Sequence, residues 1–184
     1  AASDVYKRQD TMDHATYGVK VLFEEGMIRQ FIEEDTWDDV IRTAIAKHSD
    51  YELTGITDER TLLHARLIRD ADKLDNCRVK LEDAMETLLD LSADEVGKYA
   101  ISPKVREDAF AGKCICSKDR RTPMDYWVSY VAYFYDLNFR ETLDIVAEEQ
   151  YVKRIIGRVP YTNEQTKKTM EELERQLTEY VRRK

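Results

Sequence analysis

The segment 57–89 constrains the fold of this chain most strongly, because it keeps a helical apolar period and contains neither glycine nor proline. Its apolar residues recur at spacings of four, four and three, which places them on one face of a helix: Leu63, Leu67, Ala71 and Leu74. The period continues through Leu88. We therefore expect one long helix from Thr57 or Asp58 to Leu89, with this face turned into a hydrophobic core.

The same helix carries a dense group of charges within the stretch from Leu62 to Asp75: Arg69, Asp70, Asp72, Lys73 and Asp75. Asp72 comes four residues after Ile68, so it lies at the edge of the apolar stripe. Proteins rarely bury a carboxylate without a partner cation or a metal ion. This charged group is therefore the first candidate for a functional site.

Composition points to an all-α protein and narrows the classes of ligand. The chain has 184 residues, which is enough for one domain with a core. It contains only 6 glycines and 3 prolines, while strong helix formers are frequent. The net charge of −8 argues against a nucleic-acid polymer or an anionic membrane as a partner. A small phosphorylated substrate held in a local pocket with a metal is compatible with this charge.

Cysteine usage and hydropathy indicate a cytoplasmic protein. The odd number of cysteines, Cys77, Cys114 and Cys116, does not suggest a disulfide framework, so we expect a reducing compartment. Cys114 and Cys116 form a close pair, but a structural zinc site needs a second pair of ligands. No apolar run approaches the ~20 residues of a membrane span, and no signal peptide is visible.

Helical periods and caps elsewhere predict a single-domain, all-α bundle without strands, repeats or linkers. We expect further helices over 13–25, 27–32, 35–48, 93–99, 103–111, 123–134, 139–156 (as one or two helices) and 162–181. Gly26 is the expected stop of the first, and Asp35 or Thr36 the expected cap of the helix over 35–48. The helix that begins at Pro123 is apolar on more than one face, which predicts a central position. The last helix carries a narrow apolar stripe that we expect to pack on the same domain.

Three candidate metal ligands lie on three different predicted helices: His14, His48 and Asp72. Imidazole and carboxylate together suit Mn, Fe, Zn, Ni or Co, and such an ion can activate water and neutralise phosphate charge. The ordinary alternative is that both histidines are helix-end residues and that Asp72 pairs with Arg69 or Lys73. Spacing alone favours this alternative. His64 lies off the apolar stripe, so we interpret it as a surface or interhelical residue.

Four stretches of the chain, taken in order, carry a family resemblance: Asp13-His14-Ala15 with Gly18 and Val21–Gly26; Ala44–His48; Ile68–Asp75; and Thr122–Asp125 with Trp127. Together they resemble the bacterial HD-domain proteins of the metal-dependent phosphohydrolase superfamily. The resemblance covers roughly Asp10 to the C-terminus. The ordered set of motifs is more specific than any one histidine, and it reverses the preference for the ordinary alternative.

The resemblance implies a fold of the HD type and a set of residue roles. Asp72 matches the last metal-binding aspartate of the family. His14 and His48 match two intervening histidines, which bind a second metal or contact phosphate in family members. Lys73 matches a position that can touch phosphate, and it is the residue to which we assign a catalytic role. The resemblance also implies that Arg69 and Asp75 hold this cluster in place.

The chain departs from the family pattern near its start. The first histidine and the adjacent His-Asp pair of the family have no counterpart, and no His-Asp dipeptide occurs in the sequence. Ala1–Gln9 has no apolar period and resembles translated adapter sequence, so we interpret it as a non-native tail in place of the missing helices. HD-type sequence then spans 10–184. A disordered natural tail, and a naturally divergent, inactive family member, are the alternatives.

The expected function is therefore that of a metal-dependent phosphohydrolase acting on a nucleotide or another phosphate ester. The ion would be Mn, Fe, Ni, Co, Zn or Mg. Since only three of about six family ligands are matched, we expect an impaired chain with weak metal binding, little activity and exposed apolar faces. The competing interpretation is a non-catalytic helical module that senses a nucleotide or binds a protein. The sequence leaves homo-oligomer formation open.

Overall fold

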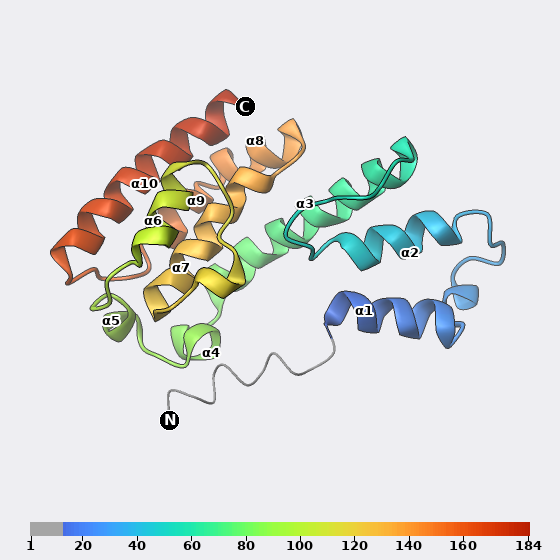
Figure 1. The fold of residues 1–184 in the computed structure, drawn as a ribbon, viewed down its shortest axis with the longest axis horizontal. Helices are drawn as coiled ribbons and strands as arrows, with labels where there is room; N and C mark the ends of the chain where they lie inside the picture. Colours follow the sequence, from blue (N-terminus) through green and yellow to red (C-terminus); the bar gives the residue numbers. More distant parts are fainter. Residues whose placement is uncertain (1–12) are drawn as a thin grey trace. The chain divides into compact units, whose positions relative to one another are not determined.

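The computed structural model describes residues 13–184, so the interpretation of Ala1–Gln9 as a tail lies outside the described residues. Within this range every regular element is a helix, which confirms the all-α prediction (Figure 1). The chain divides into two compact units, and the boundary between Asp72 and Lys73 falls inside helix α3 (Glu59–Glu82). The assignment to one HD-type domain stays a prediction. None of the described helices combines the length and apolarity needed to cross a bilayer.

Unit 1 begins with α1 (His14–Val19), which continues as a π-helical turn over Lys20–Glu24. Gly26 follows with a φ of 75°, a left-handed conformation that glycine adopts at little cost, so the predicted helix over 13–25 and its stop are confirmed. A 3₁₀ helix (Met27–Gln30) leads toward α2 (Asp38–Lys47), which packs against α1.

Helix α2 begins later than predicted. Neither Asp35 nor Thr36 caps it, because the backbone N–H of Asp38 binds the carbonyl of Asp35 and closes a turn before the helix. Trp37 holds the cap position without a side-chain hydrogen bond. The predicted end of this helix was close, since His48 directly follows its last residue.

Helix α3 is capped by Asp58, whose carboxylate accepts hydrogen bonds of 2.7 Å from both the backbone N–H and the hydroxyl of Thr61. These two bonds lower the pKa of the Asp58 carboxyl. The predicted continuation to Leu89 was wrong. The chain leaves the helix after Glu82, and extended backbone at Ala84 starts a separate helix, α4 (Met85–Leu89). This break allows Met85 and Leu89 to enter the core of unit 2.

The buried face of α3 also differs from the prediction. Leu63 and Leu67 are 52% and 55% exposed, whereas the buried residues at spacings of four include Ala65, Arg69 and Lys73. Burial of these two cations is tolerable because each has partners. Arg69 binds backbone carbonyls, and Lys73 pairs with a carboxylate. Polar residues of this helix therefore turn inward. Leu63, Leu67 and Ala71 of the predicted stripe stay exposed, while Leu74 packs against the core of unit 2.

Unit 2 continues with short helices and then packs longer ones around an aromatic centre. Their bounds are α5 (Ala93–Val96), α6 (Pro103–Phe110), 3₁₀ Ser117–Asp119, α7 (Pro123–Ala132), 3₁₀ Tyr133–Asp136, α8 (Arg140–Glu148), α9 (Tyr151–Ile156) and α10 (Glu164–Arg183). The central position predicted for α7 is confirmed, since Trp127 and Val131 are wholly buried. Helix α10 packs on α6, α8 and α9 through the predicted stripe, including Leu173 and Leu177.

A buried carboxylate ties α6 to α7. The Asp125 side chain is wholly buried and accepts hydrogen bonds from the backbone N–H of Ser102 at 2.8 Å and its hydroxyl at 2.6 Å. It also accepts bonds from the backbone N–H groups of Arg121 at 2.8 Å and Thr122 at 3.0 Å. The Thr122 hydroxyl in turn accepts a bond from the Asp125 N–H, which completes a capping box at the start of α7. This motif therefore has a structural role in unit 2.

Folding of unit 2 should weaken in alkaline solution. Burial raises the pKa of the Cys77 thiol and of the Tyr135 hydroxyl to about 12 each, above their values in an unfolded chain. The folded state then keeps protons that the unfolded state releases, so stability falls as pH rises above about 9. We expect Cys77 alone to contribute a loss of about 1.4 kcal/mol per pH unit. Urea unfolding at about pH 8.5 and 10.5 measures this loss. Cys77→Ala should reduce the slope, and a pH-independent free energy would contradict the expectation.

Candidate metal centre

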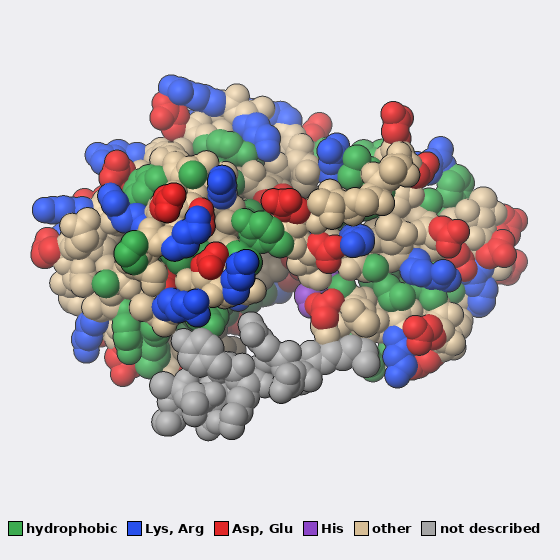
Figure 2. Space-filling view, in the orientation of Figure 1, with side chains coloured by type: hydrophobic (Ala, Val, Ile, Leu, Met, Phe, Trp, Pro, Cys, Tyr) green, Lys and Arg blue, Asp and Glu red, His purple; other side chains and the backbone are tan. Residues whose placement is uncertain are grey.

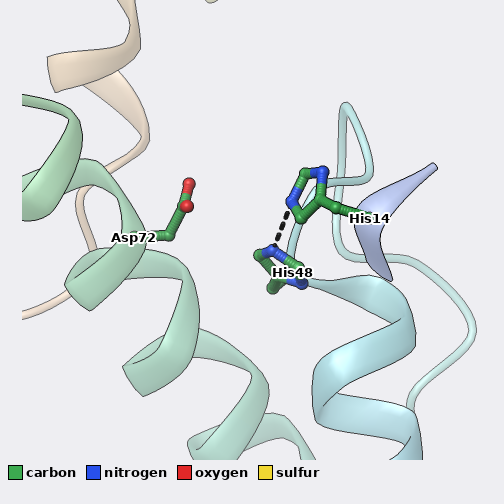
Figure 3. A group of neighbouring side chains, drawn as sticks. All are labelled: His14, His48 and Asp72. Atoms are coloured by element: carbon green, nitrogen blue, oxygen red, sulfur yellow. Dashed lines mark hydrogen bonds between the residues drawn. The ribbon is translucent and has the colours of Figure 1, made fainter. Parts of the chain in front are cut away.

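Three elements of unit 1 bring the predicted ligands His14, His48 and Asp72 together (Figure 3). His14 is the first residue of α1, His48 follows the last residue of α2, and Asp72 projects from α3 toward the two rings. One ligand atom from each residue lies within 4.8 Å of the other two. The histidines are closest, with 2.9 Å between their Nε2 atoms and the two rings edge to face. This group could hold a metal ion.

The distance between the two imidazole nitrogens fits a shared ion. Metal–nitrogen bonds of about 2.1 Å place two nitrogens roughly 3.0 Å apart at a right angle and roughly 3.4 Å apart at a tetrahedral angle. The observed 2.9 Å is near the first value. Without an ion, the same distance fits an N–H···N hydrogen bond in which one ring supplies the proton.

The second nitrogen of each ring has a partner that orients it. His48 Nδ1 lies 2.6 Å from the carbonyl oxygen of Ile45, an acceptor, so the proton of a neutral His48 is on Nδ1 and its Nε2 lone pair faces the cluster. His14 Nδ1 lies 3.4 Å from a carboxylate oxygen of Asp13. Metal-binding histidines commonly donate their other N–H to a carbonyl or carboxylate in this way. The arrangement therefore presents both Nε2 atoms to the same point.

Arg69 joins the helix that ends at His48 to the helix that carries Asp72. Its buried guanidinium donates from Nη1 to the carbonyls of His48 at 2.9 Å and Asp50 at 2.5 Å, and from Nη2 to that of Tyr51 at 3.0 Å. The last carbonyls of a helix lack partners within the helix, and a cation there also suits the helix dipole. Because Arg69 lies three residues before Asp72 on α3, these bonds fix where His48 stands relative to Asp72. This contact agrees with the role that the family resemblance implies for Arg69.

The other predicted residues have different surroundings. The Lys73 ammonium is paired with Asp136 at 2.9 Å within unit 2, so its contact with phosphate stays a prediction. The exposed Asp75 pairs with Arg78 one turn further along α3, which gives its carboxylate a partner outside the cluster. His64 is exposed on α3 and lines a groove beside α2, in agreement with its interpretation as a surface residue.

Two of the orienting contacts have no direct signal in the sequence. Ile45 acts through its backbone carbonyl, which any residue type could supply. Asp13 belongs to one of the family motifs, and its position before α1 and the hydrogen bond that its carboxylate accepts from the N–H of Thr16 identify it as a helix cap. A capping carboxylate next to a histidine is the one local pattern that could have indicated this pair.

The fold and the site define an all-α protein whose unit 1 contains a two-histidine, one-aspartate group that could hold a metal ion. Comparison with known proteins found no match: no family profile, no curated protein and no solved structure is significantly similar to the chain. The resemblance to HD-domain proteins therefore depends on the motifs and on this geometry.

Proposed function

We propose that the chain is an HD-type, metal-dependent phosphohydrolase of the reducing cytoplasm that acts on a nucleotide or another small phosphate ester. The observation that carries this proposal is the convergence of the His14 and His48 Nε2 atoms, 2.9 Å apart, with the carboxylate of Asp72. This donor set suits a divalent transition-metal ion. Because the chain has no counterpart of the family's first histidine and His-Asp pair, we expect the ion to bind weakly.

The three side chains have distinct tasks in this proposal. A bound ion supplies Lewis-acid activation of water and neutralises phosphate charge. His48, buried and fixed by Ile45, provides a rigid nitrogen donor. Asp72 provides the negative charge that favours a cation. His14 has a side chain that is 70% exposed, so the cluster is open to solvent on that side and a small substrate can reach it.

Metal binding tests the site directly. Asp72→Asn and His48→Gln should each lower the affinity for Co²⁺ by about tenfold or more, because each removes one of three donors. His64→Gln is the matched control, since His64 lies on α3 outside the cluster and should leave the affinity unchanged. Equilibrium dialysis and the visible absorption of bound Co²⁺ measure the effect. Equal losses in the control, or unchanged binding in both ligand variants, would contradict the assignment.

An assay of phosphate release distinguishes a phosphohydrolase from a non-catalytic binding module. With Mn²⁺ or Co²⁺ added, we expect slow hydrolysis across a panel of nucleotides and p-nitrophenyl phosphate, abolished in Asp72→Asn. Lys73→Met tests the phosphate contact, and it should raise KM more than it lowers kcat. Metal-dependent binding of a nucleotide without any hydrolysis would favour the competing function of a non-catalytic sensing module.

A further inference from the structure

An apolar groove of about 500 Å³ runs between α2 and the first half of α3 in unit 1. Its walls are mainly aliphatic and aromatic, and they include Ile41 and Ile45 from α2, Trp37 just before it, and Leu67, Ile68 and Ala71 from α3. Arg60 also lines the groove, with its guanidinium over the Trp37 ring. Helix α2 has ten residues, so the groove is about 15 Å long, or roughly three turns of a helix. This length and lining suit a helix that lays its apolar face into the groove.

Large side chains of the groove remain in solvent. Leu67 is 55% exposed and Trp37 is 45% exposed. Within the described part of unit 1, the buried apolar residues are few, and all except Ile28 are alanines: Ala15, Ile28, Ala44 and Ala65. Contiguous exposed apolar surface of this kind marks interaction sites in soluble proteins. Covering this groove with apolar side chains should therefore lower the free energy.

The net charge of unit 1 indicates which kind of molecule would cover the groove. Residues 13–72 contain fourteen acidic and seven basic side chains, a net charge of −7 out of −8 for the whole chain. Figure 2 shows acidic side chains along the edge of unit 1 near the start of α2. Seven acidic residues and three arginines lie near the starts of α2 and α3. The acidic residues are Glu33, Glu34, Asp35, Asp38, Asp39, Asp58 and Glu59, and the arginines are Arg29, Arg42 and Arg60. Two of these arginines already pair with Asp38 and Asp39.

We propose that this groove binds a cationic amphipathic helix of a partner protein. The apolar face of the helix would cover Trp37 and Leu67. Its basic residues would face the carboxylates near the starts of α2 and α3, outside the groove lining, which attract and steer it. A second copy of the chain fits less well, because two units with a charge of −7 repel each other. The proposal is independent of metal binding, since the groove and the ligand cluster are lined by different residues.

Titration of the full chain with a synthetic helix of about 14 leucine and lysine residues tests the proposal, with a scrambled peptide and a leucine–glutamate peptide as comparisons. Trp37 reports binding, because Trp127 is wholly buried and the chain has no other tryptophan. We expect a blue shift of the Trp37 fluorescence with the amphipathic lysine peptide alone. Leu67→Gln should weaken its binding at least about fivefold.

Leu63→Gln is the matched control, because Leu63 lies on the same helix and is 52% exposed, but it does not line the groove. It should bind the lysine peptide like the unaltered chain, and neither substitution should unfold the protein. Equal weakening by both substitutions, or equal binding of the glutamate or scrambled peptide, would overturn the proposal. Self-association that Leu67→Gln abolishes would also overturn it and would identify a second copy as the occupant.

Discussion

Replacing Arg69 with methionine should destabilise unit 1 by about 2–4 kcal/mol, because the carbonyl oxygens of His48, Asp50 and Tyr51 would lose a charged donor. Methionine keeps most of the aliphatic volume, so the loss reports the hydrogen bonds more than the packing. The end of α2 would then be free to shift, and with it the Nε2 atom of His48. We expect the affinity for Co²⁺ to fall about 10- to 100-fold, as for other residues that hold metal ligands in place.

Arg69→Lys should give an intermediate result, since an ammonium group lacks the planar fork that reaches three carbonyls at once. Arg66→Met is the matched control, because Arg66 is exposed on the same helix. Urea unfolding gives the stability, and Co²⁺ titration at a temperature where every variant is folded gives the affinity. If Arg69→Met lowers stability and leaves the affinity and the Co²⁺ spectrum unchanged, Arg69 supports the fold without positioning His48.

Replacing Asp125 with alanine should cost unit 2 about 3–5 kcal/mol. The substitution would leave four donors from Ser102, Arg121 and Thr122 without their common acceptor in a buried place. Asp125→Asn should be nearly as damaging, because its amide nitrogen would face N–H groups in place of one carboxylate oxygen.

Asp144→Ala is the control for the two Asp125 substitutions. Asp144 forms an exposed ion pair with Arg140 one turn away on α8, and such surface pairs contribute about 0.5 kcal/mol or less. Urea unfolding followed by circular dichroism measures all three variants. A loss below about 1 kcal/mol for Asp125→Ala would show that water or relaxed backbone replaces the carboxylate.

The helices that the sequence predicted well begin and end with local signals. Pro103 at the start of α6, the Thr122 box before α7 and Asn163 before α10 satisfy backbone groups within three or four residues, so a short window suffices to find them. Gly26 ends the first helical run for the same local reason. The break after Glu82 has no such signal, because it depends on where Met85 fits in a core built from distant residues.

The candidate ligands could be predicted, but their environment could not. Motif order placed His14, His48 and Asp72 in one group, and the structure brings them together. The inward face of α3 was predicted wrongly because apolar periodicity assumes that charges stay in solvent. Arg69 is buried through backbone carbonyls that lie about twenty residues earlier in the chain, and a carbonyl leaves no mark in the sequence.

Helix α3 runs without a break across the boundary between the two units, with Asp72 as the last residue of one and Lys73 as the first of the other. Helix formation is cooperative, so a residue is held helical by its neighbours on both sides. Cys77, packed in the core of unit 2, therefore helps to keep the turn that carries Asp72 from fraying. The candidate ligand Asp72 is thus held by helical turns on both sides, and fraying from either end of α3 has to pass through several residues before it reaches the site.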